Sequence, residues 1–140
     1  MFDQPLREIM EQRKFLTASP DSTVSNAAKL MSDRNAGAVL VVQEDQLIGI
    51  FTERDAVFRV VAKGLQAENT RLAEVMTSDP KTLDPDKSYG HALLLMHENG
   101  FRHVPVIENG KPIGIVSSRN AMDPEMEEFI SEERRREYHR

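Results

Sequence analysis

Residues 17–55, TASPDSTVSNAAKLMSDRNAGAVLVVQEDQLIGIFTERD, decide the fold because this stretch recurs later in the same chain. Shifted by 65 residues and without a gap, it lies over residues 82–120, and 12 of the 39 aligned positions are identical. Similar segments, residues 7–10 and 73–76, precede the two copies. A solenoid needs more than two such units, so the repeat predicts a tandem pair.

Within each copy the hydrophobic period changes in the same order. Apolar residues at helical spacing predict amphipathic helices over 24–31 and 89–96. Each helix is followed by two short apolar runs with a polar turn between them, which predicts hairpins at 38–51 and 103–116. A second helix is expected over 53–63, ended by Gly64. With Thr17 and Thr82 on short strands before the first helix, the unit becomes β-α-β-β-α, which is an α+β fold.

Composition limits the class of protein. The 140 residues are 39% hydrophobic, which suffices for one continuous core. The net charge of −5 shows no clustered basic surplus, so we expect no nucleic-acid partner. Cysteine is absent, which excludes disulfides and thiol nucleophiles. No apolar run is long enough for a membrane span and Asp3 stands where a leader would be basic, so we expect a cytoplasmic protein without a membrane partner.

The repeat also suggests how the chain is divided. We predict a first repeat over residues 1–64, a linker over 65–71 and a second repeat over 72–122. Residues 123–140 are expected to form an additional helix, with Asp123 as its N-cap. The arginine run in this helix is matched by more numerous acidic residues, which favours a solvated face over a nucleic-acid site.

Polar side chains gather where each predicted hairpin ends, in GIFTERD at 49–55 and GIVSSRN at 114–120. Thr52 and Ser117 supply a hydroxyl at the start of a helix, where free N–H groups bind phosphate. The Asp55 carboxylate can accept two hydrogen bonds from a vicinal diol such as a ribose. The same residues also fit helix N-caps with a polar residue three positions on. Both interpretations remain open at this point.

These two segments, the strand FRHVPV at 101–106 and the lead-ins ending at Met10 and Met76 together resemble the CBS domain family, and specifically a tandem CBS pair, or Bateman module. The resemblance covers residues 6–122. It implies two copies of the β-α-β-β-α unit packed sheet to sheet with pseudo-two-fold symmetry, with two ligand clefts between the sheets. It also implies a regulatory ligand, namely AMP, ADP, ATP, NAD or S-adenosylmethionine.

The resemblance assigns roles to individual residues. Asp55 would hold ribose hydroxyls and Thr52 would approach a phosphate, while Ser117 would take the phosphate side of the second cleft. The remaining predicted site residues are Arg102 and His103 for the phosphates, Thr17 and Thr82 beside the adenine, Val39 and Val104 as apolar walls, and Ile50, Arg54, Ile115 and Asn120 from the two motifs. Asn120 stands where an aspartate is usual, and its neutral amide predicts unequal sites.

Three functions are compatible with the sequence. We prefer a non-enzymatic sensor that binds an adenosyl ligand, forms a homodimer and controls an unidentified partner protein. The apolar residues Ala56, Val57, Val60 and Val61 suit such a dimer interface. The alternative is a structural dimerisation or interaction module whose motifs are only caps. A small nucleotide-directed enzyme is the third, but the sequence offers neither a phosphate-binding glycine loop nor a nucleophile with a base beside it.

The histidines do not favour a metal site. His91, His97 and His103 recur every six residues, and this spacing places the first two on different sides of a helix. His103 begins the following predicted strand. We therefore expect solvated or ligand-adjacent histidines.

Overall fold

The computed structural model describes residues 2–10, 15–120, 129 and 132–136. Its elements are α1 (Leu6–Ile9), β1 (Thr17–Ala18), α2 (Val24–Arg34), β2 (Ala38–Gln43), β3 (Gln46–Thr52), α3 (Glu53–Asp55), the π-helix η1 (Ala56–Val61), the 3₁₀ helix η2 (Ala67–Asn69), α4 (Leu72–Val75), β4 (Thr77–Ser78), α5 (Tyr89–Asn99), β5 (His103–Glu108) and β6 (Lys111–Ser117). Helix α2 matches α5, and the hairpin β2–β3 matches β5–β6, at the predicted shift. The α+β fold is confirmed.

The two long helices begin and end with the same local chemistry. The Thr23 hydroxyl accepts a hydrogen bond from Asn26 N (3.1 Å), and the Ser88 hydroxyl accepts one from His91 N (3.2 Å). Both helices then end in the left-handed conformation, at Asn35 (φ 50°) and Gly100 (φ 73°). Asparagine and glycine tolerate this conformation best. The caps therefore bound both helices at equivalent places.

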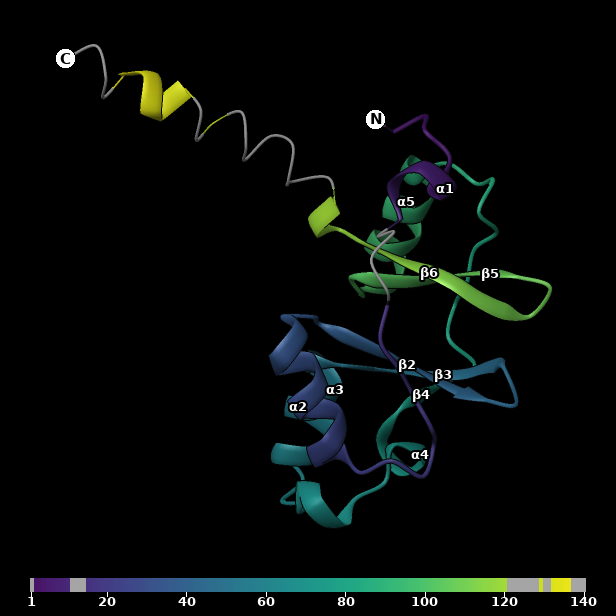
Figure 1. The fold of residues 1–140 in the computed structure, drawn as a ribbon, viewed down its shortest axis with the longest axis vertical. Helices are drawn as coiled ribbons and strands as arrows, with labels where there is room; N and C mark the ends of the chain where they lie inside the picture. Colours follow the sequence, from purple (N-terminus) through teal and green to yellow (C-terminus); the bar gives the residue numbers. More distant parts are fainter. Residues whose placement is uncertain (1, 11–14, 121–128, 130–131, 137–140) are drawn as a thin grey trace.

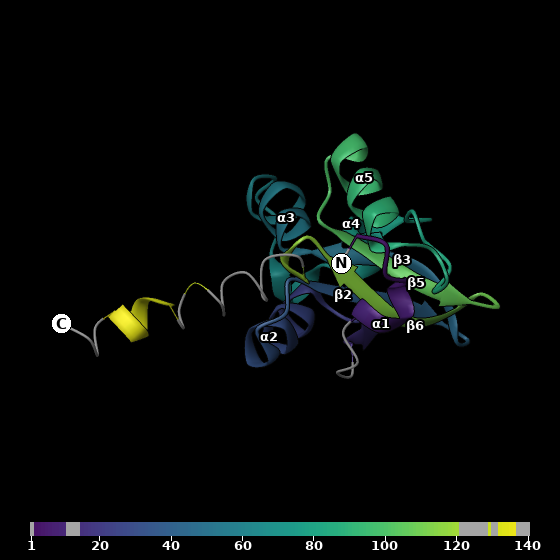
Figure 2. The same ribbon diagram turned by 90° about the horizontal axis from the view of Figure 1, so that it is seen from above.

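The hairpins also match in detail. Glu44 and Asp45 (φ 51° and 63°) form one turn, and Asn109 and Gly110 (φ 56° and 78°) form the other. Two successive residues with positive φ suit a tight turn between twisted antiparallel strands. Each hairpin also has an irregular register, between Val41 and Val42 and between Val106 and Ile107. The two tips lie on the same side of the molecule (Figures 1 and 2), where Leu47 N reaches Gly110 O at 3.5 Å.

The lead-in of the second repeat joins the sheet of the first. That sheet has the order β1-β2-β3-β4, in which β1 is parallel to β2, and β4 is antiparallel to β3. The other sheet contains β5 and β6. The predicted strand at Thr82 is reduced to a single parallel bridge between Leu83 and Val106, which corresponds to the pairing of Ala18 with Val41.

The short lead-in helix of each repeat packs into the core of the other repeat. Leu72 and Val75 of α4 are buried in the first core, among residues of α2, β2, β3 and η1. Leu6 of α1 is fully buried in the second core, with residues of α5, β5 and β6. Gly49 and Gly114 allow this crossing, because a Cβ on Gly49 would collide with the Met76 side chain and one on Gly114 would lie 2.6 Å from Met10 Sδ.

The two halves stack with their sheets facing each other and their helices outside (Figure 1). Ala38, Leu40 and Ile50 are buried between the sheets, and Ile115 of the opposite sheet packs against them. Sheet-to-sheet packing, which the family resemblance implied, is thereby confirmed. The C-terminal ends of β3 and β6, at Thr52 and Ser117, both border the space between the halves.

Two expectations about helices need adjustment. The helix predicted over 53–63 begins as α3 but continues as the π-helix η1, in which Ala62 N bonds Val57 O at 2.8 Å. Within the predicted linker, η2 adds one short helical turn. The helix predicted from Asp123 onward lies mostly outside the described residues. In this region the structure describes Phe129 and residues 132–136, and these are helical. Among the described residues, none of the helices combines the length and apolarity that crossing a bilayer requires.

Candidate functional site

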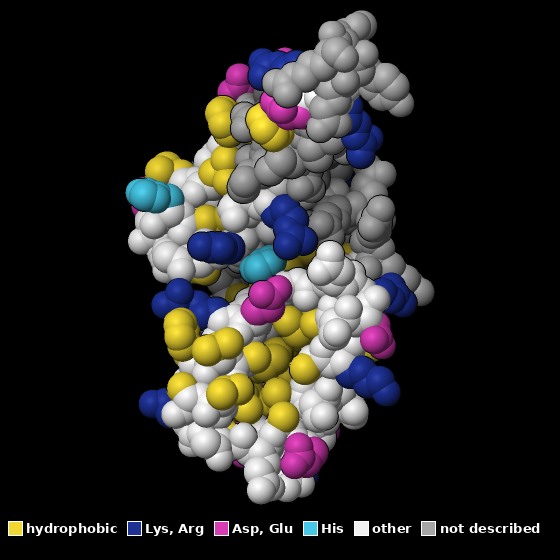
Figure 3. Space-filling view, turned by 90° about the vertical axis from the view of Figure 1, so that its left-hand side faces the viewer, with side chains coloured by type: hydrophobic (Ala, Val, Ile, Leu, Met, Phe, Trp, Pro, Cys, Tyr) yellow, Lys and Arg dark blue, Asp and Glu magenta, His cyan; other side chains and the backbone are white. Residues whose placement is uncertain are grey.

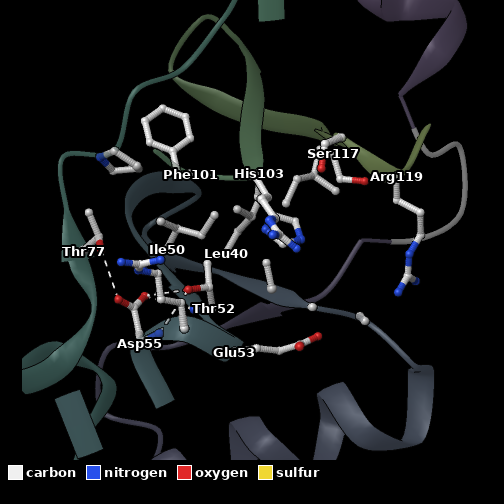
Figure 4. Close-up of a pocket in the computed structure, with 18 of the residues that line it drawn as sticks. Leu40, Ile50, Thr52, Glu53, Asp55, Thr77, Phe101, His103, Ser117 and Arg119 are labelled. Atoms are coloured by element: carbon white, nitrogen blue, oxygen red, sulfur yellow. Dashed lines mark hydrogen bonds between the residues drawn. The ribbon is translucent and has the colours of Figure 1, made fainter. Parts of the chain in front are cut away.

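An open cleft of about 1900 Å³ lies between the two halves (Figure 4). Nine of the predicted site residues line it: Ile50, Thr52, Arg54, Asp55, Arg102, His103, Ile115, Ser117 and Asn120. The two hairpin-end motifs, 65 residues apart in the sequence, therefore open into the same space. That they bind a ligand there stays a prediction.

Asp55 is the last residue of the short helix α3 and is 7% exposed. Its Oδ2 accepts hydrogen bonds from Thr52 N (3.0 Å) and from the Thr52 hydroxyl (3.2 Å). Asp55 N donates in return to Thr52 Oγ1 at 3.2 Å, which completes a capping box. The capping interpretation of this motif is thus realised, and one carboxylate oxygen is engaged by it.

The other carboxylate oxygen of Asp55 faces the lead-in of the second repeat. Its Oδ1 lies 3.4 Å from Arg59 Nε and accepts a hydrogen bond of 3.5 Å from the Thr77 hydroxyl (Figure 4). Arg59 Nη1 also donates to Met76 O at 2.9 Å and to Val75 O at 3.4 Å. These contacts are longer than those at Oδ2, so Oδ1 is the more available acceptor for a ligand.

The second motif has fewer hydrogen bonds between its hydroxyl residue and the polar residue three positions on than the first motif has. Asn120 Oδ1 accepts from Ser117 N at 2.8 Å and from the Ser117 hydroxyl at 3.5 Å. The buried Tyr89 hydroxyl donates to Ser117 O at 2.8 Å and fixes the end of β6 from the core side. The motif thus keeps one half of the capping box of the first one, namely the bonds that the side chain three positions on accepts, with a neutral amide in place of the carboxylate.

His103 and Glu53 meet across the junction of the halves at Gly37. A Cβ placed on Gly37 would lie 2.9 Å from Glu53 Oε1 and 3.0 Å from His103 Nε2. A larger residue would have to displace the ends of these two side chains, so glycine lets both lie here as they do. Burial is the main cause that lowers the pKa of His103; Glu53 opposes this effect, while Arg119 and Arg102 add to it.

The cleft carries a surplus of positive charge although the chain is acidic overall. Among the described lining residues are six cations, Arg34, Arg54, Arg59, Lys81, Arg102 and Arg119, and three carboxylates, Glu53, Asp55 and Asp79. Figure 3 shows Lys, Arg and His side chains gathered along the seam between the halves. Such a field favours an anionic ligand.

Four predicted site residues do not reach the cleft. Val39 and Val104 are fully buried in the two helix-facing cores, because alternation along β2 and β5 turns them away from the space between the sheets. The prediction that they form its apolar walls is corrected: Ala38, Leu40 and Ile50 take that place. Thr17 and Thr82 lie outside the cleft lining, where Phe15, Leu16, Pro80 and Lys81 stand instead.

The sequence analysis missed several lining residues. Leu40 and Phe101 supply apolar surface, Thr77 reaches Asp55, and Arg119 belongs to the second motif itself (Figure 4). The repeat itself carried a signal for Arg119, since it is the equivalent of the predicted Arg54. The sequence carried no signal for Thr77, because this residue contacts Asp55 only when the lead-in of the second repeat packs against the first half.

The stacked halves, crossed lead-ins and paired motifs define a tandem-repeat module with a ligand-sized cleft between its copies. The CBS domain family matches the chain twice, over residues 6–62 and 72–124. The chain therefore belongs to the CBS domain family.

Individual relatives agree with this assignment. The CBS domain-containing protein CBSX3, mitochondrial, of Arabidopsis thaliana is 36% identical over 108 residues, covering 74% of this chain and 52% of that protein. The chain thus spans about half the length of this curated relative. An uncharacterised conserved protein from Pyrococcus horikoshii has a structure with a TM-score of 0.82 at 26% identity, covering 89% of this chain and 94% of that one.

A further structure is similar in fold and contains ligands. The CBS domain pair of protein MJ0100 was solved in complex with 5′-methylthioadenosine and S-adenosyl-L-methionine. Its TM-score is 0.76 at 24% identity, covering 84% of this chain and 92% of that chain.

Proposed function

We propose that this protein is a regulatory CBS pair that binds an adenosyl ligand between its two halves and transmits the binding to a partner protein. The observation that carries the proposal is the meeting of both hairpin-end motifs in one cleft with a surplus of positive charge. The adenosyl compounds bound by the MJ0100 domain pair support the ligand class. The proposal needs no catalytic group, because a ligand that binds one arrangement of the halves more tightly than another shifts the equilibrium between them.

The lining suggests how such a ligand lies. Its ribose hydroxyls would donate to Asp55 Oδ1, and its base would contact the apolar surface of Leu40, Ile50 and Phe101. Phosphates would extend toward Arg102 and Arg119. Because six cations face three carboxylates in the lining, we expect AMP, ADP, ATP or NAD to bind more tightly than the positively charged S-adenosylmethionine.

The two motifs are proposed to bind unequally. Hydrogen bonds to a charged acceptor are roughly twice as strong as those between neutral groups. The Asp55 motif should therefore fill first, and the Asn120 motif should bind weakly or stay empty. Asn120→Asp tests this inequality: it should add a second saturable event in a calorimetric titration.

The central experiment is isothermal titration of nucleotide-stripped protein with AMP, ATP, NAD and S-adenosylmethionine. Asp55→Asn keeps the cap acceptor but removes the charge, and should weaken nucleotide binding about 10- to 100-fold, the equivalent of one charged hydrogen bond. Glu74→Gln is the matched control, since Glu74 also caps a helix by accepting from Arg71 N (2.7 Å) but does not line the cleft.

The alternative function is an interaction module without a ligand. It is favoured by one observation, the complete capping box at Thr52 and Asp55, which gives these residues a structural role. If all four compounds fail to bind while Asp55→Asn lowers the melting temperature as Glu74→Gln does, this alternative is correct. A homodimer, a regulated partner and a cytoplasmic location remain predictions under either function.

A further inference from the structure

Arg59 is placed where it can connect the two repeats. It belongs to η1 of the first repeat, and its guanidinium lies between Asp55 and the backbone that leads into β4 of the second. One edge of the guanidinium faces Asp55 Oδ1, 3.4 Å away, and Nη1 faces the carbonyl oxygens of Met76 (2.9 Å) and Val75 (3.4 Å). A planar, forked donor is suited to bridging a carboxylate and carbonyls at once.

The segment that Arg59 contacts is joined to β3 by a short backbone pairing, and Asp79 N also donates to Ile48 O at 3.2 Å. Strand β4 has two residues, and its pairing with β3 is limited to Thr77 with Ile50 and Ser78 with Gly49. The Thr77 hydroxyl adds a long hydrogen bond to the same Asp55 oxygen. The Asp55 oxygen that would also receive a ligand hydroxyl is thus one of the attachments that place β4.

The sequence of the second repeat does not supply the same ion pair. At the shift of 65 residues, Asp55 corresponds to Asn120 and Arg59 corresponds to Pro124. Neither an amide nor a proline can form an ion pair. The link between motif and lead-in is therefore a property of the first repeat.

We propose that Arg59 is a positioning residue that fastens the Asp55 carboxylate to the Val75–Met76 backbone, so that ligand binding at Asp55 stabilises the lead-in of the second repeat. The inference rests on the proposed function, since it requires a ligand at Asp55. Arg59 need not touch that ligand. Because its side chain is 49% exposed, the ion pair alone is weak, and the bonds to the carbonyls are needed to fix its position.

The test combines ATP titration with amide hydrogen exchange of the full chain. In the wild type, saturating ATP should slow exchange of the amides of residues 76–79 severalfold. Arg59→Met should weaken ATP binding about three- to tenfold, less than Asp55→Asn does, because Arg59 acts on the ligand only through Asp55 and its ion pair is exposed, and should abolish the added protection. Lys63→Met, on the exposed turn after η1, removes the same charge as a control and should change neither result.

Arg59→Lys separates positioning from charge. Lysine restores a cation beside Asp55 but not the planar fork, so affinity should return to within about twofold of the wild type while protection of residues 76–79 stays below half. If the wild type binds none of AMP, ATP, NAD and S-adenosylmethionine, the proposed function fails and this inference fails with it. If the wild type binds ATP, but Arg59→Met keeps both affinity and protection, this inference alone is overturned.

Discussion

Gly37, Glu53 and His103 form a contact in which single residues from both halves determine the local electrostatics. His103 belongs to β5 of the second half, whereas Gly37 and Glu53 flank the first hairpin. Burial and the neighbouring Arg119 and Arg102 favour the neutral imidazole, and the Glu53 carboxylate favours the charged one. The balance leaves the pKa of His103 below its ordinary value of 6.5.

This lowered pKa predicts a pH-dependent stability. Below pH 6.5 the unfolded chain binds the His103 proton more readily than the folded protein does, so stability is complete above 6.5 and falls as the pH drops toward the folded pKa. Chemical denaturation from about pH 7 to about pH 5 should show this loss, with a slope from this group of at most about 1.4 kcal/mol per pH unit. His103→Gln should remove that part of the slope, and Glu53→Gln should lower the pKa of His103 further in an NMR titration.

A control and a contrary result can be stated for the same measurement. His91→Gln changes an exposed histidine on α5 and should leave the His103 contribution in place. If His103→Gln leaves the pH dependence of the unfolding free energy unchanged, the prediction is wrong, and protonation of His103 does not affect stability.

At the scale of elements, the periodicity of the sequence predicted the helices and hairpins that recur in both repeats. It did not predict features that depend on packing against the other half. Helix α2, helix α5 and both hairpins follow from local patterns and caps. The all-apolar run of β2 is buried on both faces, so it does not tell which of Val39 and Leu40 faces the cleft. Likewise, η1 differs from an α-helix only in its hydrogen-bond register, which a hydrophobic pattern does not record.

The crossing of α1 into the second core is an element-scale feature that mutation can test. Leu6 is fully buried there, so Leu6→Ala should cost about 2–5 kcal/mol of unfolding free energy. Amide hydrogen exchange should show the loss of protection in α5, β5 and β6, far along the chain from the substitution. Leu72→Ala in α4 is the matched variant, and its loss should fall on α2, β2 and β3. Loss at α2 and β2 in Leu6→Ala would contradict the crossing.

At the scale of the whole molecule, the first half leaves apolar surface uncovered. Val57, Phe58 and Val61 of η1 are 52%, 51% and 72% exposed, whereas Val60, which we expected beside them, is buried in the first core. A groove of about 410 Å³ lies between α2 and η1 and includes Met31, Phe51 and Val57. Figure 3 shows hydrophobic side chains gathered over this half, below the charged seam. A patch of this kind on a small domain is typical of an interface.

We expect this surface to join two copies of the chain, because an isologous dimer would cover the same patch on both. The double variant Val57→Asp, Val61→Asp places charges in the interface and should shift the protein from dimer to monomer in sedimentation equilibrium. Burying unpaired charges opposes association, whereas both positions are solvent-exposed in the single chain and its fold should tolerate them. Gln43→Asp on the exposed end of β2 adds charge away from the patch and should leave the dimer intact. A wild type that sediments as a monomer would contradict the dimer and leave the patch to a different partner. The cleft would be unaffected, because it lies within one chain.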